Sequence, residues 1–105
     1  MRESAILTAI CQYLQYQENL GQLVFIRNNS GAFINPKGQF YKMGRPGSPD
    51  LLIFLKNGRC AHIEVKNEKG KQNEAQKEYE QAVTDLGHDY HVVRSVEQVE
   101  QLLNS

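Results

Sequence analysis

The feature that most constrains the fold is a pair of apolar segments joined by a tight turn. Residues 51–55 are a continuous apolar run, residues 60–65 are mostly apolar, and Asn57-Gly58 between them is a strong short-range signal for a β-hairpin. Because neighbouring positions in each run are apolar, both faces of each strand must be buried. The pattern therefore predicts two adjacent strands at the centre of a mixed α/β sheet with helices on both sides.

Hydrophobic periodicity places the other elements. Helices are expected at residues 3–18, at about 74–86 with Gly87 as its end, and at 96–103. Strands are expected at 23–26 and 90–93. Residues 28–49 are rich in Gly, Asn, Pro and Ser and predict a long loop with a weak hairpin between 32–34 and 40–41. The residues of the second helix expected to face inward are Ala75, Tyr79, Ala82, Val83 and Leu86.

Composition indicates a single folded domain spanning residues 1–105. The chain is 40% hydrophobic and 23% charged, which excludes a disordered protein. No apolar run approaches the roughly 20 residues of a membrane helix, and the polar start of the chain is not a signal peptide. Cys11 and Cys60 lie far apart and are interpreted as small apolar residues, not as a disulfide or a zinc site. A reducing, cytoplasmic location is expected.

Opposite charges are segregated along a chain whose net charge is zero. Residues 19–49 hold four basic residues and no acid, whereas residues 67–105 hold eight acids and four bases. Such segregation can create a basic face that suits a polyanion. The four basic residues of the first segment are Arg27, Lys37, Lys42 and Arg45.

Three charged residues interrupt the apolar hairpin. Asp50 directly precedes the first strand, and Glu64 and Lys66 lie at the end of the second. Burying a carboxylate is costly unless it is paired or bound to a metal, and two neighbouring carboxylates raise each other's pKa. A divalent cation would remove both costs.

The hairpin register decides whether the two carboxylates can meet. A two-residue Asn57-Gly58 turn would place Asp50 opposite Val65, on the other face from Glu64. A three-residue loop, with Gly58 left-handed, places Asp50 opposite Glu64. We expect the second register, or an equivalent bulge before Leu51. Either one puts Asp50 on the same face as Glu64, and the second register does so for Asp50, Leu52, Phe54, Cys60, His62, Glu64 and Lys66.

These residues resemble a known nuclease signature. Pro49-Asp50, followed fourteen positions later by Glu64-Val65-Lys66, resembles the PD-(D/E)xK motif. With Gly47 and Ser48 before it, Gln76 in the following helix and Glu3 in the first, the set is similar to the VRR-NUC (virus-type replication-repair nuclease) domain, in its stand-alone phage or prophage form. Asn29-Ser30-Gly31-Ala32 and Val92-Val93-Arg94-Ser95 are similar to that family's loop and last strand.

The resemblance implies a restriction-endonuclease-like fold and a role for each residue. Asp50, Glu64 and the Val65 carbonyl would bind Mg²⁺ or Mn²⁺ as oxygen ligands. Lys66 would orient or activate the water, Glu3 would reach a second metal, and Gln76 would contact the water, the phosphate or Lys66. The DNA backbone would be bound by Arg27, Lys37, Lys42 and Arg45.

The implied activity is a metal-dependent endonuclease of DNA repair that cuts branched DNA, with the four-way (Holliday) junction as the leading substrate. Two symmetric nicks need two active sites, so a homodimer is expected. Its interface is expected at the first helix or at residues 23–26. Two alternatives remain open: another flap, nicking or restriction-type nuclease with the same chemistry, or a non-catalytic DNA-binding subunit.

Structural explanations of the same residues also remain open. Glu3 can also be explained as a first-turn acid that the helix dipole favours. Asn73 and Gln76 have the spacing of a capping box. Glu64 and Lys66 can form an ion pair on an edge strand, with Asp50 capping a turn. The histidines are interpreted as a core or supporting residue (His62) and as surface residues (His88, His91).

Overall fold

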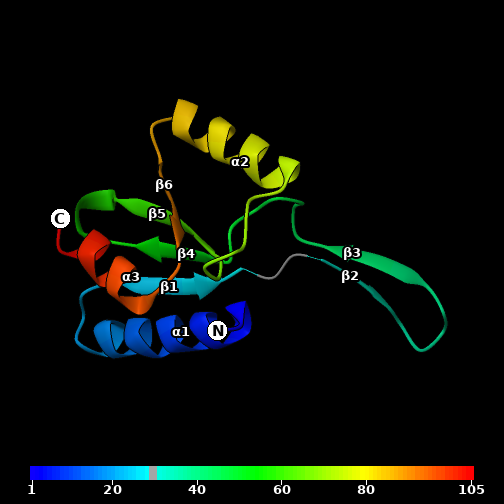
Figure 1. Ribbon diagram of the computed structural model, residues 1–105, viewed down its shortest axis with the longest axis horizontal. Helices are drawn as coiled ribbons and strands as arrows, with labels where there is room; N and C mark the ends of the chain where they lie inside the picture. Colours follow the sequence, from blue (N-terminus) through cyan, green and yellow to red (C-terminus); the bar gives the residue numbers. More distant parts are fainter. Residues whose placement is uncertain (29–30) are drawn as a thin grey trace.

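A four-stranded mixed sheet forms the body of the molecule, and a two-stranded arm projects from it (Figure 1). The computed structural model describes residues 1–28 and 31–105. Its elements, in chain order, are α1 (Glu3–Asn19), β1 (Val24–Arg27), β2 (Gly31–Ile34), β3 (Phe40–Met43), β4 (Leu51–Phe54), a 3₁₀ turn (Lys56–Gly58), β5 (Cys60–Val65), α2 (Glu74–Asp85), β6 (Asp89–Val93) and α3 (Val96–Leu103). The sheet order is β1-β4-β5-β6, with only the β5–β6 pair parallel.

The central hairpin has the register that brings Asp50 to Glu64. Leu51 pairs with Ile63 and Phe54 with Cys60, and continuing this pairing by one residue places Asp50 opposite Glu64. The connection is the three-residue turn Lys56–Gly58, in which Asn57 and Gly58 both have positive φ. This confirms the three-residue loop and the left-handed Gly58. It also confirms β4 and β5 as central strands, because each has a strand on both sides.

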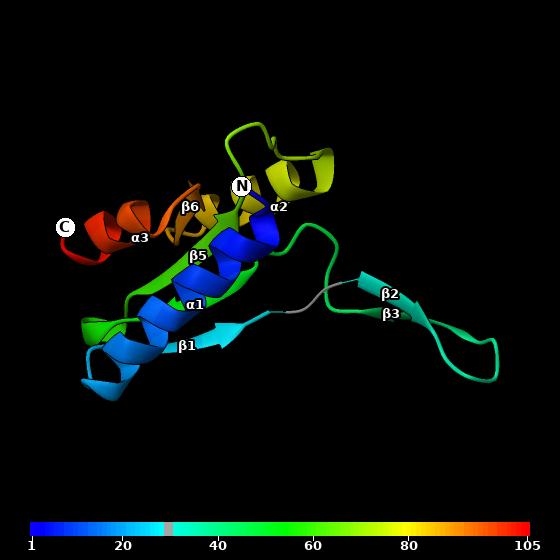
Figure 2. The same ribbon diagram turned by 60° about the horizontal axis from the view of Figure 1, so that its bottom comes forward.

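The two faces of the sheet are covered differently (Figure 2). One face carries Leu51, Ile53 and Ile63, which form the hydrophobic core with α1 and α3. Residues next to these in sequence, Leu52 and His62, point to the other face, where α2 lies. No residue of α2 is fully buried. The second face is therefore the more open one, and it carries the polar side chains.

Two expectations about α2 need correction. Ala82 and Leu86 were expected to face inward, yet both are exposed, and Leu86 is 78% exposed. The helix touches the sheet mainly through its first half, so its last turn extends beyond the apolar surface. Gly87 does end the helix: its φ is +89°, and the amides of Gly87 and His88 bond back to Thr84 and Val83.

The weak hairpin predicted within the long loop is confirmed as an antiparallel pair of strands. β2 and β3 pair from Gly31 with Met43 to Ile34 with Phe40, and all their residues are exposed. The aromatic rings of Phe33 and Tyr41 stack with centroids 5.4 Å apart. Along the described residues, no helix combines the length and apolar character needed to cross a bilayer.

Candidate active site

Asp50 is positioned by a network that begins at the end of β1. The Asn28 backbone N–H donates to the Asp50 carbonyl (2.8 Å), and the Asn28 side-chain amide donates to Ser48 Oγ (2.9 Å) and to the Pro49 carbonyl (2.8 Å). The Asp50 carboxylate accepts a hydrogen bond from the Val65 N–H at 2.7 Å. Asp50 is thereby held beside the end of β5, as the predicted register requires.

Gly47 brings this turn against the start of α2. Its φ is +83°, and a Cβ at this position would lie 2.2 Å from the carbonyl oxygen of Ala75. Any larger residue would push the loop and the helix apart. Because Ala75 is next to Gln76, the close approach couples the position of Asp50 to that of Gln76. Gly31 also has a positive φ, of +149°. Both glycines therefore serve the backbone conformation.

Glu64 is the most deeply buried charged residue of the site, with 3% exposure. Its Oε1 accepts a hydrogen bond from Gln76 Nε2 (2.9 Å) and lies 4.0 Å from Lys66 Nζ. Its Oε2 is buried and has no hydrogen-bond partner among the described residues. Burial, and then the charge and hydrogen bond of the neighbouring Asp50, raise the pKa of Glu64 from 4.5 to about 8, although Lys66 opposes the shift.

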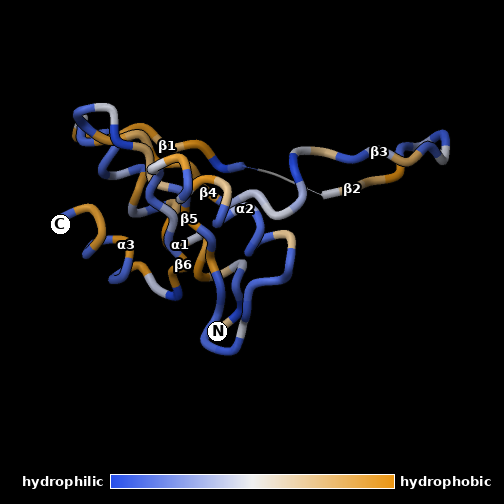
Figure 3. Tube along the Cα trace, turned by 90° about the horizontal axis from the view of Figure 1, so that it is seen from above, coloured by the Kyte–Doolittle hydropathy of each residue, from blue (hydrophilic) through white to orange (hydrophobic). Residues whose placement is uncertain are grey.

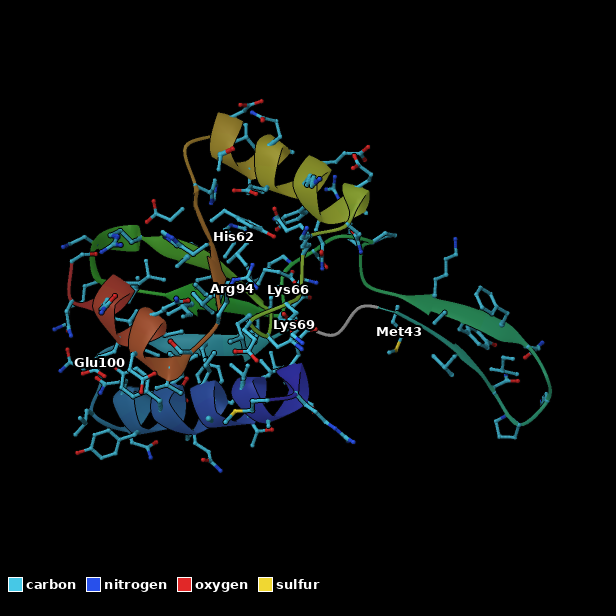
Figure 4. The ribbon with its side chains drawn as sticks, in the orientation of Figure 1. Met43, His62, Lys66, Lys69, Arg94 and Glu100 are labelled. Carbon is cyan, nitrogen blue, oxygen red and sulfur yellow. The ribbon has the colours of Figure 1, made fainter. Side chains whose placement is uncertain are left out.

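Lys66 and the Val65 carbonyl complete the end of β5. The Lys66 side chain is 13% exposed and lies where the strand ends, near Lys69 and Arg94 in Figure 4. The N–H and C=O of one strand residue point to the same side. Since the Val65 N–H meets Asp50, its carbonyl also points toward Asp50. Glu64 and Lys66 do form an ion pair, but β5 lies between β4 and β6, so the expectation that this pair lies on an edge strand is wrong.

Gln76 forms the capping box that was considered for it, and its side chain also reaches Glu64, whereas a contact with the water, the phosphate or Lys66 stays a prediction. Its backbone N–H donates to Asn73 Oδ1 and its Oε1 accepts from the Asn73 N–H, which is a complete capping box. Its remaining group, Nε2, donates to Glu64. The cap fixes the side chain, and the fixed side chain then orients the buried carboxylate.

Glu3 and the basic residues lie farther from this centre. Glu3 is the exposed first residue of α1, and its charge adds only a small upward contribution to the pKa of Glu64. Arg27 ends β1, whereas Arg45 lies over the ring of Tyr79 with Cζ 5.5 Å from its centroid. Lys42 lies on the arm and Lys37 at its tip. All four basic side chains are exposed.

Two supporting residues were missed by sequence reasoning. Asn28 organises the Ser48-Pro49 turn, but an Asn that follows a strand carries no distinctive signal. Arg94 was noted only as part of a motif in the last strand. In the structure its guanidinium donates to the carbonyls of Asn67 and Gly70 (2.8 Å to Gly70), which orders the loop directly after Lys66.

The donors at this site suit a divalent cation that prefers oxygen. Asp50 and Glu64 provide carboxylate oxygens, and the Val65 carbonyl is directed to the same place. The observation that tests the fit is the partnerless Oε2 of Glu64, since a buried carboxylate oxygen without a donor is stable only when protonated or bound to a cation. The residues present therefore fit the Mg²⁺ or Mn²⁺ implied by the sequence.

A family model now confirms the resemblance to the VRR-NUC domain. The model of the VRR-NUC domain matches residues 3–97. The chain belongs to the VRR-NUC family. A solved structure described as a VRR_NUC domain superposes with a TM-score of 0.66, covering 99% of this chain and 97% of that one, at 24% identity. No curated protein sequence matches the chain.

Membership of the VRR-NUC family makes this a nuclease domain, and DNA is the substrate that a nuclease domain of this kind implies. The mixed sheet flanked by helices agrees with the restriction-endonuclease-like fold. Asn29 and Ser30, which contribute to the resemblance, lie outside the described residues.

Proposed function

We propose that this VRR-NUC domain is a Mg²⁺- or Mn²⁺-dependent endonuclease that cuts branched DNA as a homodimer, with four-way junctions as the preferred substrate, in the cytoplasm of a bacterial host. The observation that carries the catalytic part is the buried Glu64 beside the half-buried Asp50, with Glu64 Oε2 left without a partner among the described residues. An ion pair that served only the structure would need one carboxylate and one base. It would not need a second carboxylate, and it would not leave a buried carboxylate oxygen without a hydrogen-bond donor.

Asp50, Glu64 and the Val65 carbonyl would hold the cation. When bound, the cation would neutralise charge on the scissile phosphate. Asp50 is kept in place by the Val65 N–H, and Glu64 by Gln76, so both carboxylates are oriented before any substrate arrives. Such preorganisation lowers the cost of reaching the transition state. Glu3, at the start of α1, would serve a second cation or its water shell.

Lys66 would provide the positive charge next to the attacking water and the scissile phosphate. Its ammonium lies 4.0 Å from Glu64 Oε1 at the end of β5, and most of its side chain is covered. From there it would orient the attacking water and stabilise the negative charge that develops on the phosphate. Gln76 acts as a positioning residue, because its amide holds Glu64.

The exposed bases would bind the DNA backbone. Lys37 and Lys42 lie on the projecting arm, and Arg27 and Arg45 lie closer to the sheet. Phosphate contacts from these side chains release counterions, so affinity should fall steeply with salt.

Exposed apolar residues on the arm support a homodimer (Figure 3). A two-stranded hairpin is marginally stable alone, yet this arm exposes 69% of Ile34 and 63% of Phe40. On the open sheet face, Val24 and Ile26 of β1 are also about half exposed. We propose that each arm packs on a second copy. The apolar face of α1 is buried in its own core, so of the two predicted interfaces β1 is the one retained.

A substrate panel tests the proposal. Labelled four-way junction, flap, single-stranded and linear duplex DNA are incubated with Mg²⁺, Mn²⁺ or EDTA, and cut positions are mapped. We expect paired, symmetric nicks in the junction that require metal. Light scattering should give twice the mass of the 12.0 kDa chain, and Ile34→Ser with Phe40→Ser should give single chains.

Other outcomes of the panel separate the alternatives. Preferred cutting of flaps or linear duplex would assign another nuclease activity to the same chemistry. Binding to every substrate without a cut would indicate a non-catalytic DNA-binding subunit. A single-chain mass at working concentration would contradict the dimer.

A further inference from the structure

A second group of metal-binding side chains lies at the opposite end of β5 from Glu64. Cys60 begins β5, and His62 shares its face two residues later. His88 directly precedes β6, whose residue Asp89 pairs with Ala61. The Cys60 sulfur and one ring nitrogen from each histidine all lie within 4.8 Å of one another. The nuclease chemistry uses none of these three residues.

The spacing of the two imidazoles fits a shared ion. His62 Nε2 and His88 Nδ1 are 3.4 Å apart, and the two rings meet edge to face at 82°. Two nitrogens bound to one tetrahedral zinc ion at about 2.0–2.1 Å would lie roughly 3.3–3.4 Å apart. One thiolate and two imidazoles form a donor set that Zn²⁺ prefers, whereas the oxygen donors at Asp50 and Glu64 suit Mg²⁺.

A supporting residue holds His62 in the required orientation. The Tyr79 hydroxyl lies 2.9 Å from His62 Nδ1, which directs the other ring nitrogen, Nε2, toward His88. His62 is 6% exposed, so its ring position is fixed by packing as well (Figure 4). A hydrogen bond to the second nitrogen of a ligating histidine is the usual partner contact in zinc sites.

A groove gives access to the cluster from solvent. It has a volume of about 400 Å³, and its lining includes Cys60, His88 and Asp89. The Asp89 carboxylate is 3.3 Å from Arg59, in a pair whose two side chains are about half exposed. Such a pair contributes little to stability, so Asp89 is free to turn toward the groove. The groove thus provides an entry path and room for a fourth ligand.

We propose that Cys60, His62 and His88 form a structural Zn²⁺ site, with a water or Asp89 in the fourth position. The ion would connect the start of β5 to the turn between α2 and β6. This is the region that needs such a connection, because α2 has no fully buried residue. The proposal replaces the interpretation of Cys60 as a small apolar residue, and it does not depend on the proposed nuclease activity.

Titration with Co²⁺, a spectroscopic substitute for Zn²⁺, tests this site in the reduced, full-length protein. Excess Mg²⁺ is present to occupy the oxygen site. We expect one equivalent of Co²⁺ to bind. The absorption spectrum should then show the charge-transfer band of a cobalt–thiolate bond and the visible bands of a tetrahedral Co²⁺ ion. Zn²⁺ should displace it and raise the melting temperature by at least about 5 °C.

Matched variants identify the ligands. Cys60→Ser should remove the thiolate band, and His88→Ala should weaken binding at least about tenfold. Cys11→Ser and His91→Ala are the matched controls and should bind like the parent protein; His88 is exposed, so its loss should leave the fold intact. The proposal is overturned if no thiolate band forms, if Cys11→Ser removes it, or if Cys60→Ser and His88→Ala bind as the parent does.

Discussion

At Glu64, stability and pH are linked to the proposed binding of a metal. One carboxylate oxygen meets Gln76 and Lys66, while the other has no partner among the described residues. Burying an ionised group in this way is costly, so the metal-free protein favours the protonated form. A bound cation favours the ionised form. Without metal, Glu64 should therefore make the folded protein less stable as the pH rises. A bound metal ion should reduce this dependence of stability on pH.

The first prediction concerns this pH dependence. The pKa of Glu64 is raised to about 8 in the folded protein from its usual 4.5, so the folded state binds the proton more tightly than the unfolded chain. The stabilising contribution is therefore complete below about pH 4.5 and is lost as pH rises toward and through about 8. Melting temperatures measured in EDTA between pH 5 and 9 should fall more steeply for the parent than for Glu64→Gln.

The difference between the parent and Glu64→Gln isolates this group from others that titrate, such as His62, whose pKa is lowered by burial and by His88. Mg²⁺ should stabilise the parent more at pH 8 than at pH 6 and should have little effect on Glu64→Gln. Parallel pH profiles for the two proteins in EDTA would show that Glu64 does not titrate in this range.

Lys66 carries the second prediction. Lys66→Ala should lower the rate of cleavage by about 100-fold or more, because it removes a positioned charge at the reacting phosphate. Lys69→Ala removes an exposed lysine from the adjacent loop and is the matched control. Single-turnover cleavage at saturating enzyme measures the effect. Full activity in Lys66→Ala would exclude its role in activating water.

At the residue scale, the sequence identified those residues whose charge is unusual for their position. Charged residues next to apolar strands have few structural explanations, so Asp50, Glu64 and Lys66 were identifiable, and the structure brings them together. Asn28 was not identifiable, because its contribution lies in hydrogen bonds to a turn twenty residues away. The proximity of Cys60 to His62 and His88 could not be foreseen, because it depends on strand pairing.

At the scale of elements, one close contact couples the turn that precedes Asp50 to the start of α2. Gly47 lies against the Ala75 carbonyl at the start of α2, where the capping box also fixes Gln76. Both sides of the site therefore depend on the same packing. The apolar runs and the Asn57-Gly58 turn predicted β4 and β5 as central strands, which they are, although the second face of β4 is only partly covered. The inward face of α2 was predicted poorly, since periodicity does not show where the sheet beneath a helix ends.

The third prediction follows from this contact. Gly47→Ala should destabilise the protein by about 2–4 kcal/mol, combining left-handed backbone strain with overlap against Ala75. Gly21→Ala is the matched control, because Gly21 has a similar φ of +77° and nothing within 4 Å of its missing Cβ. Gly21→Ala should lower the free energy of unfolding only by the backbone strain, about 1–2 kcal/mol. Urea unfolding measures both, and equal losses would contradict the packing role of Gly47.

At the scale of the whole molecule, the arm was the least predictable part. The chain between β1 and β4 has no strong periodicity, so a loop with a weak hairpin was all that the pattern supported. The structure shows an exposed apolar hairpin that also carries Lys37 and Lys42. The arm therefore combines the surface proposed for a second copy with part of the surface proposed for DNA.

The fourth prediction concerns that charged surface. Lys42→Ala and Arg45→Ala should each weaken DNA binding and reduce the slope of log affinity against log salt by about one. Lys56→Ala is the control, because Lys56 is exposed in the turn between β4 and β5, at the far end of the sheet from Asp50. Fluorescence anisotropy over a salt series measures the slopes. Unchanged slopes would remove Lys42 and Arg45 from the phosphate contacts.

The central claim is that the Asp50–Glu64 pair makes this domain a metal-dependent DNA nuclease. The most direct measurement is cleavage of a labelled four-way junction by the parent protein and by Asp50→Asn, across a Mg²⁺ titration that starts from EDTA. We predict cleavage that rises with Mg²⁺ in the parent and is absent in Asp50→Asn, although both bind the junction. Equal cleavage by the two proteins, or cleavage by the parent in EDTA, would contradict the account.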